Sequence, residues 1–452
     1  MRQLVIICES SHAHLVEGAV KTFCHPALAR FVSVIAVDVG AGGPFKSELD
    51  RLISLARNDL EGTSQPPLVC HTREAGSALK VKNLATALGF DTKIESLSQL
   101  TKIQNGDNSP VPMRSRLNEC GLSLRGGAVE LLQHWSHAKV DRNGVDAWLN
   151  QFGQLGKAYA WIGEAILASI SLVPAADLGE LFGQIALPTG ATICINRDPR
   201  TTAKSGDVIS NLLTKRHNGV TIHTSPASAI EDHGARSVVV FEDGLWSGTE
   251  ALGIIESLLG LREPHRMKTQ SLKDSSLLAN VELIFAYGVA TDYGAAMVEY
   301  FLREKGLGNV RIAAAHKIEV APAAVLDQLK SGSVNFDEWR EKGPTGGIPP
   351  HVFATFAARG VSAAQIEEAK QFCAAIGTQL FEQYLQAQAA VRKWDPWPPE
   401  KLARASVGMH GLGMVHAFAH SVPKATLPLL WQGGKVTLNG RTVNWVPLFK
   451  NS

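Results

Sequence analysis

Residues 237–260, SVVVFEDGLWSGTEALGIIESLLG, decide the fold of the central part of this chain. The four apolar residues 238–241 predict a buried strand, and two acids, Glu242 and Asp243, follow it directly. Residues 246–249 (WSGT) then lead into an apolar helix. A strand, a short loop and a helix in this order are typical of a parallel α/β sheet, in which ligands bind beyond the carboxyl ends of the strands.

The side chains of this stretch suit a phosphorylated sugar. The amino terminus of a helix offers unpaired N–H groups to a phosphate, and Ser247 and Thr249 add hydroxyl donors. Gly248 allows the backbone to close around an anion. Glu242 and Asp243 are placed to accept hydrogen bonds from two neighbouring ribose hydroxyls. The alternative is an ordinary helix start, in which Asp243 and Ser247 only satisfy backbone donors.

The arrangement VVVF-ED-GL-WSGT at residues 238–249 resembles the phosphoribosyl pyrophosphate signature of type I phosphoribosyltransferases. That signature has four apolar residues, two acids, two further residues and a phosphate loop that ends in Thr. The chain departs from the common form at Trp246, where a small hydroxylated residue is usual. The resemblance implies that Glu242 and Asp243 are catalytic and that residues 247–249 bind the 5′-phosphate.

A basic loop follows another predicted strand, at residues 191–195. Residues 196–207 (NRDPRTTAKSGD) hold the position at which type I enzymes place a pyrophosphate-binding loop. Arg197 and Lys204 supply cations, and Ser205 opens the next helix, which suits a diphosphate. A diphosphate ligand also implies Mg²⁺ as a cofactor. The alternative is a solvated surface loop with a serine cap.

Three further segments resemble one divergent branch, the phosphoribosyltransferase-like family of bacterial conflict systems, PRTase-CE. They are AWLNQF (147–152), KSGDVISNLLTKR (204–216) and HSVPKATLPLLW (420–431), and the resemblance covers about residues 140–450. The family resemblance implies a component of antiviral defence and does not imply a known substrate. Together with the motif at residues 238–249, it leads to the hypothesis of a toxic effector that binds a phosphoribosyl pyrophosphate-like nucleotide and acts at its anomeric carbon. The alternative is an inactive nucleotide-sensing or scaffold subunit. Either role implies a protein partner from a defence operon, such as a retron reverse transcriptase complex.

The sequence predicts an α/β protein in three parts. Residues 1–130 alternate strands and amphipathic segments, as in a small doubly wound, Rossmann-like domain of unknown role. Residues 140–320 form the phosphoribosyltransferase-like parallel sheet. Residues 321–452 form a helical extension of the same unit, with a terminal hairpin that turns at Asn439-Gly440. The strands expected in the central sheet lie at residues 191–197, 219–224, 237–244, 281–289 and 309–316.

The carboxy-terminal part concentrates histidines and aromatic residues. His416 and His420 are four residues apart, a spacing that can place two metal ligands on one helix face, with His410 nearby. No third ligand stands at a fixed spacing, which favours a structural or pocket-lining role. Pro423 and Trp431 are candidates for the wall of a pocket, where an indole can stack on a base, and core packing is the alternative for both.

Composition excludes several classes of protein. The chain has 452 residues, 45% of them hydrophobic and 19% charged, which favours packed domains over disorder. A formal net charge of +2 argues against direct, sequence-specific nucleic-acid binding. The six cysteines show no CxxC spacing, and residues 158–176 contain Glu164 and Pro174, which favours a buried helix over a membrane span. We therefore expect a cytoplasmic protein without a membrane segment.

Overall fold

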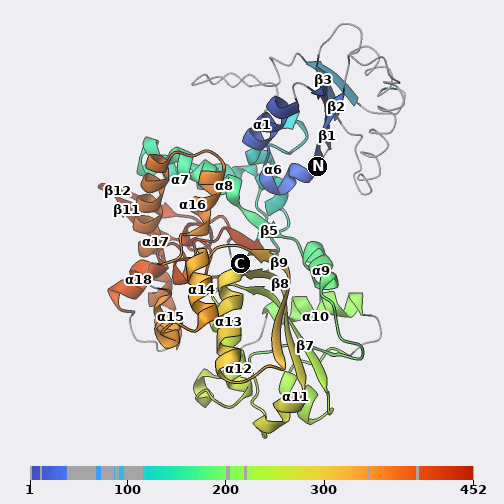
Figure 1. Ribbon diagram of the computed structural model, residues 1–452. Helices are drawn as coiled ribbons and strands as arrows, with labels where there is room; N and C mark the ends of the chain where they lie inside the picture. The colour runs from blue at the N-terminus through green and yellow to red at the C-terminus, as the bar shows by residue number, and fades with distance from the viewer. Residues whose placement is uncertain are drawn as a thin grey trace.

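A computed structural model of the chain has three regions: an amino-terminal sheet, a central sheet and a large helical region (Figure 1). None of the helices in the residues that it describes is both long and apolar enough to cross a membrane. The structure describes residues 3–10, 13–37, 68–72, 86, 91–95, 116–117, 119–199, 204–217, 221–344, 347–392 and 397–450.

The amino-terminal sheet is fully parallel and has the strand order β2-β1-β3-β4. Helix α1 connects its first two strands, which confirms the predicted strand and helix alternation at this end of the chain. The helical segments predicted after β2 and β3 lie outside the described residues, apart from residue 86. The elements are β1 (Leu4–Glu9), α1 (Ala13–Phe23), η2 (Pro26–Phe31), β2 (Val32–Val37), β3 (Leu68–Thr72) and β4 (Asp91–Glu95).

The central sheet is also parallel, in the order β6-β7-β8-β9. Strand β7 is buried on both faces of this sheet: its Val239 and Phe241 pack into one apolar cluster, while Val238 and Val240 pack into another. The strands are β6 (Thr192–Ile195), β7 (Ser237–Leu245), β8 (Glu282–Thr291) and β9 (Val310–Ile318). The helices around them are α9 (Ala175–Gln184), α10 (Lys204–Arg216), α11 (Pro226–Glu231), α12 (Thr249–Leu258), η4 (Pro264–Arg266), η5 (Ser275–Asn280), α13 (Asp292–Glu304), α14 (Ala323–Ser331) and α15 (Phe336–Lys342).

Two details of this sheet differ from the sequence prediction. The strand predicted at residues 219–224 is reduced, among its described residues, to a single parallel bridge between Cys194 and His223. Strand β7 extends one residue beyond the expected range 237–244, to Leu245, and Glu242 pairs with Tyr287 of β8. The two acids therefore lie within the last part of β7, as expected.

The carboxy-terminal helices share one apolar core with the helices that precede the sheet. Figure 1 shows α7, α8, α16 and α17 grouped together in this region. Trp148 of α7 illustrates this packing, since its indole N–H donates to the Leu429 carbonyl at 3.1 Å. A short parallel pair, β5 with β10, joins the same two parts of the chain. The elements are α6 (Leu124–Leu132), α7 (Arg142–Leu155), η3 (Lys157–Tyr159), α8 (Ala160–Ser169), β5 (Ser171–Val173), α16 (His351–Ala358), α17 (Ala363–Arg392), α18 (Pro399–Ala405), η6 (Met409–Gly411), β10 (His416–Phe418) and α19 (Pro428–Trp431).

The predicted terminal hairpin is confirmed as β11 (Gly434–Leu438) and β12 (Arg441–Trp445). Asn439 and Gly440 both have positive φ, 50° and 75°, as a two-residue turn of this kind requires. Side-chain amides of α17 cover the free edge of β11: Gln379 exchanges two hydrogen bonds with the backbone of Thr437, and Gln383 does the same with Lys435. Such cover protects a sheet edge from pairing with another chain.

A buried histidine joins the amino-terminal domain to the helical region. His25 is fully buried, and its Nε2 donates to the Leu167 carbonyl of α8 at 3.2 Å. It packs closely on Gly127, where an added Cβ would come within 2.5 Å of the His25 side chain. Burial lowers the pKa of His25 to about 4, and the Arg359 guanidinium acts in the same direction. His25 is therefore neutral in the contact between the amino-terminal domain and α8.

This histidine predicts a pH dependence of stability. Between about pH 4 and 6.5 the unfolded chain takes up a proton on His25 that the folded chain does not, so stability is complete above this window and falls on acidification through it. The contribution to the slope is at most about 1.4 kcal/mol per pH unit. His25→Gln keeps a donor for Leu167 and should lose less stability over this window than the wild type in denaturant titrations. His14→Gln, at an exposed position of α1, is the control; an unchanged slope in His25→Gln would contradict this assignment.

Candidate functional site

The loop between β7 and α12 has the geometry of an anion-binding turn. Gly248 caps α12 with φ of 80°, and a Cβ at this position would lie 2.9 Å from the Gly294 carbonyl oxygen. Only glycine satisfies both constraints without strain. The hydroxyl of Thr291 donates to the Trp246 carbonyl, which fixes the loop to the start of α13. The free N–H groups of α12 therefore stand at a defined position at the sheet edge.

The hydroxyls predicted to bind phosphate lie together in this loop. Ser247 Oγ and Thr249 Oγ1 are 3.2 Å apart, and Thr249 Oγ1 is 3.3 Å from Nε2 of His410. His410 comes from η6 in the carboxy-terminal region and has φ of 59°, a left-handed conformation that is uncommon for a residue with a side chain. The carboxy-terminal region thus supplies a third polar side chain to the phosphate loop.

The two acids of the motif have different environments. Asp243 Oδ2 accepts hydrogen bonds from His420 Nε2 at 3.0 Å and from Ser421 Oγ at 3.1 Å, while Oδ1 accepts from the Gly244 N–H at 2.7 Å. Asp243 is 17% exposed and His420 is 6% exposed. Asp243 is therefore held by the carboxy-terminal segment, whereas the sequence placed it to accept a hydrogen bond from a ribose hydroxyl.

Glu242 accepts no such hydrogen bonds within the described part of the chain. Burial raises its pKa well above the usual range, and the Asp243 and Glu250 carboxylates add to this rise. The neighbouring Tyr287 hydroxyl also has a raised pKa, because of its burial and then because of Glu242. Glu242 is therefore the acid of the pair whose oxygens remain available to a ligand.

A cavity of about 400 Å³ brings these groups together. One wall consists of the motif, from Glu242 to Ala251, with Lys268 and Tyr287 beside it. The opposite wall comes entirely from the carboxy-terminal region and includes three large aromatic side chains. Its lining residues are Phe381, Tyr384, Leu385, Trp397, Met409, His410, Pro423, Lys424 and Ala425. The site is thus formed between two parts of the chain rather than by the sheet alone.

The cations that line this cavity are Lys268 and Lys424, which differ from the predicted ones. Arg197 leaves β6 at the same edge of the sheet, as the parallel pairing of β6 and β7 requires, but it is exposed and does not line the cavity. Ser205 lies half-buried in the first turn of α10, and the side chain of Lys204 lies outside the described residues. The structure therefore does not place Arg197 or Ser205 in this cavity.

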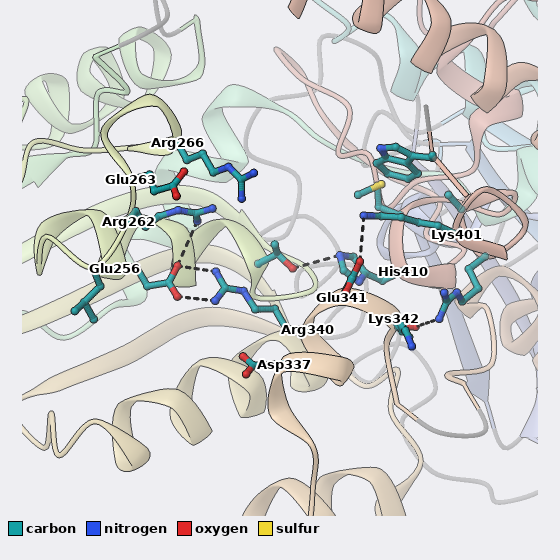
Figure 2. Close-up of a pocket in the computed structure, with 16 residues that line it drawn as sticks. Glu256, Arg262, Glu263, Arg266, Asp337, Arg340, Glu341, Lys342, Lys401 and His410 are labelled. Carbon is teal, nitrogen blue, oxygen red and sulfur yellow. Dashed lines mark hydrogen bonds and ion pairs between the residues drawn. The ribbon is translucent and has the colours of Figure 1, made fainter. Parts of the chain in front are cut away.

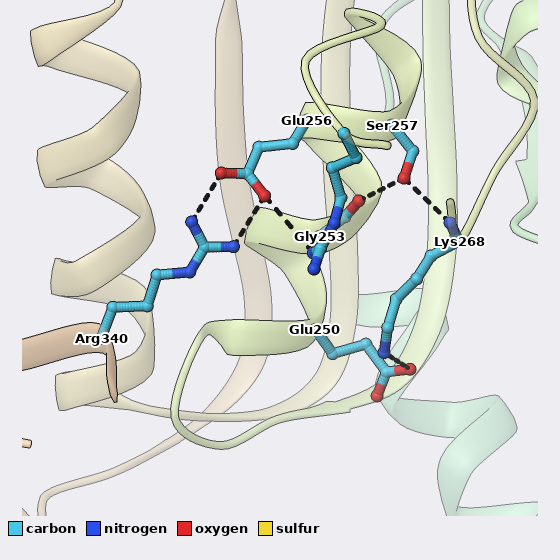
Figure 3. Close-up of polar contacts among 7 residues, drawn as sticks. Glu250, Gly253, Glu256, Ser257, Lys268 and Arg340 are labelled. Atoms are coloured by element: carbon cyan, nitrogen blue, oxygen red, sulfur yellow. Dashed lines mark hydrogen bonds and ion pairs between the residues drawn. The ribbon is translucent and has the colours of Figure 1, made fainter. Parts of the chain in front are cut away.

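Contacts on α12 place Lys268 at the cavity (Figure 3). Ser257 Oγ donates to the Gly253 carbonyl at 2.6 Å and accepts from the Lys268 backbone N–H at 2.8 Å. The Lys268 ammonium then pairs with Glu250 at 3.2 Å, in the first turn of α12. Because Ser257 is buried, loss of its two hydrogen bonds would lower the free energy of unfolding. Nothing in the spacing of the sequence marks Lys268, because the anchor is a tertiary contact.

The histidines and aromatic residues of the carboxy-terminal region make packing and polar contacts. No group of three or more potential metal ligands occurs in the described residues. His416 of β10 packs against Trp246, with ring centroids 5.8 Å apart, and burial lowers its pKa to about 3. Trp246 also contacts Phe418, so its indole is part of the packing between β7 and β10. Trp431 is a core residue, since its buried indole N–H donates to the Thr426 carbonyl, whereas Pro423 lines the cavity.

A parallel sheet with an acid pair near the end of a strand, followed by a glycine-containing loop and a helix, is the arrangement of a phosphoribosyltransferase-like α/β protein. The model of the PRTase-CE family matches residues 145–451, which is most of the chain, and the chain belongs to this family. The range agrees with the predicted one and leaves the amino-terminal domain outside. No curated protein matches the chain in sequence.

The contrast between the two acids predicts different effects of their amide variants on stability. Asp243→Asn keeps the shape of the side chain but replaces one carboxylate oxygen by an N–H₂ group. This group faces a hydrogen-bond donor in either orientation of the amide: the Gly244 N–H, or His420 and Ser421. We expect the free energy of unfolding to fall by about 1–3 kcal/mol. Glu242→Gln removes a carboxylate that burial disfavours, and stability should be unchanged or higher. Urea unfolding of both variants measures the difference; equal losses would contradict the assigned environments.

Proposed function

We propose that the chain binds a phosphoribosyl pyrophosphate-like nucleotide ligand in the 400 Å³ cavity and acts at its anomeric carbon. One observation carries the proposal: the cavity is lined at once by the phosphate loop, by an available carboxylate and by two lysines. The N–H groups of α12 and the hydroxyls of Ser247 and Thr249 suit a 5′-phosphate. Anion sites of this kind need no further basic residue at the loop itself.

The position of Glu242 suits the ribose. An ionised carboxylate accepts hydrogen bonds from ribose hydroxyls and stabilises positive charge that develops on the sugar as the bond from C1 to the leaving diphosphate breaks. The electron pair of that bond leaves on the diphosphate oxygen, and an acceptor atom or water forms the new bond to C1. The pKa of Glu242 is raised on balance, because burial and the Asp243 and Glu250 carboxylates outweigh the Lys268 ammonium, which acts in the opposite direction. A cation bound beside Glu242 would favour its ionised form. Lys268 and Lys424 are the cavity cations that suit the diphosphate.

Mg²⁺ fits this site with Glu242 as its protein ligand. Mg²⁺ is commonly held by one or two carboxylates together with substrate phosphates and water. Asp243 is already held by three hydrogen-bond donors, which leaves Glu242 as the acid with free oxygens. When bound, the ion would neutralise charge on the diphosphate. The chain would then position the ion through Glu242 and the sugar through the phosphate loop.

A second candidate function is binding without turnover, as a nucleotide-sensing or scaffold subunit. The observation that favours it is the occupation of Asp243 by His420 and Ser421, because this acid is then unavailable to a ribose hydroxyl. A site with one free carboxylate retains recognition of the phosphate and loses part of the stabilisation of the sugar. Measuring binding and turnover on the same preparation separates the two functions.

The cellular role that we propose is antiviral defence, exerted together with a protein partner. The support is the resemblance of the family to components of bacterial conflict systems. A phage-protection assay tests it with wild type and with Glu242→Gln, which is expected to fold normally. Protection by the wild type and its loss in Glu242→Gln would support an effector that needs this site; equal protection by both would support a scaffold role.

The binding proposal is tested by titration calorimetry of the full chain with phosphoribosyl pyrophosphate and Mg²⁺. Thr249→Val removes one hydroxyl at constant shape and should weaken binding about tenfold, since a hydrogen bond to a charged group contributes about 1.5–3 kcal/mol. Thr214→Val, whose hydroxyl bonds only within α10, is the control. Pyrophosphate release is measured in parallel. Absence of binding, or equal binding by both variants, would contradict the proposal.

A further inference from the structure

A second, strongly charged cleft adjoins the cavity on the side of the phosphate loop. It has a volume of about 520 Å³ and lies between the loop after α12 and helices α15 and α18 (Figure 2). Six of its lining side chains are cationic and four are acidic, so the cleft has an excess of two positive charges. The cationic residues are Arg262, Arg266, Arg340, Lys342, Lys401 and Arg404.

Internal ion pairs use only part of this positive charge. Glu256 takes up two of the cations, since Arg340 binds it through two hydrogen bonds of 2.5 and 2.6 Å and Arg262 lies 3.3 Å away. Lys401 is only at the limit of an ion pair with Glu341, at 4.0 Å. Arg266 is exposed and forms no ion pair within the described part of the chain. Figure 2 shows Arg266 and Lys401 extending from opposite sides toward the space between them.

The cleft and the cavity share one wall. Thr249, Trp397, Met409 and His410 line both of them. The contact between Thr249 Oγ1 and His410 Nε2 is therefore the boundary at which the phosphate loop meets the basic cleft. The pKa of His410 is lowered to about 4, first by burial and then by Lys401 and Arg404, so the cations of the cleft act on this boundary. A phosphate held by the loop would have the cleft directly beyond it.

We propose that the basic cleft binds phosphate groups that extend beyond the 5′-phosphate of the ligand, so that the site accepts a ribonucleoside with a 5′-diphosphate or 5′-triphosphate chain. This inference rests on the proposed function, because it takes the 5′-phosphate to be bound at residues 247–249. A ligand with a single 5′-phosphate would leave the charge of the cleft unused. Arg266 and Lys401, on opposite walls, are the side chains that we assign to the outer phosphates.

Calorimetric titration of the full chain with AMP, ADP and ATP tests the inference, in the absence of Mg²⁺ so that the number of phosphates is the only variable. ATP should bind about tenfold more tightly than AMP, as expected for two partly solvated ion pairs. The double variant Arg266→Gln/Lys401→Gln should lose this advantage while its affinity for AMP is unchanged. Lys330→Gln/Lys370→Gln, which removes two exposed lysines outside both hollows, is the matched control and should behave as the wild type.

The outcomes separate this inference from the proposed function. If AMP binds and ATP binds no more tightly, or if the double variant weakens AMP and ATP equally, the cleft assignment is wrong and the phosphate loop stands. Inorganic tripolyphosphate that binds as tightly as ATP without competition from AMP would also overturn it, because the cleft would then be separate from the loop. If neither AMP nor phosphoribosyl pyrophosphate binds, both proposals fail together.

Discussion

The contact of Asp243 with His420 and Ser421 is the interaction on which the site depends. It joins a strand of the central sheet to a segment that follows it by 177 and 178 residues. A parallel sheet buried on both faces leaves its functional groups at the strand ends, where they are open to water. The carboxy-terminal region covers this edge with an aromatic wall and so turns an open edge into a cavity. Asp243 fixes the position of that wall.

The same contact explains how two adjacent carboxylates coexist at a sheet edge. Asp243 is satisfied by three donors, two of them from the carboxy-terminal segment. Glu242 has no comparable donors in the described residues, and its raised pKa follows from burial and from the neighbouring acids. Environments that separate the properties of neighbouring acids are typical of functional sites. In this protein, Asp243 contacts the carboxy-terminal segment, and Glu242 lines the cavity.

The parts of the fold that could be predicted from sequence are those with local causes. The apolar run at residues 238–241, Gly248 and the turn at Asn439-Gly440 each act over a few residues, and the structure confirms the strand, the loop and the hairpin. The opposite wall could not be predicted, because packing of distant helices decides which side chains reach the cavity. The segment 420–431 was marked by its resemblance, yet its spacing indicated neither the contact of His420 with Asp243 nor the burial of Trp431 in the core.

The basic loop shows the limit of reasoning from topology. Parallel strands place Arg197 at the correct edge of the sheet, but its side chain is exposed, and Lys268 and Lys424 line the cavity instead.

A crystal structure of the full chain with phosphoribosyl pyrophosphate and Mg²⁺ tests the central claim most directly. The account predicts the 5′-phosphate at residues 247–249 and the ribose at Glu242, with the contacts of Asp243 to His420 and Ser421 intact. Ligand density at another surface, or a ribose bound by Asp243 after release of His420, would contradict it.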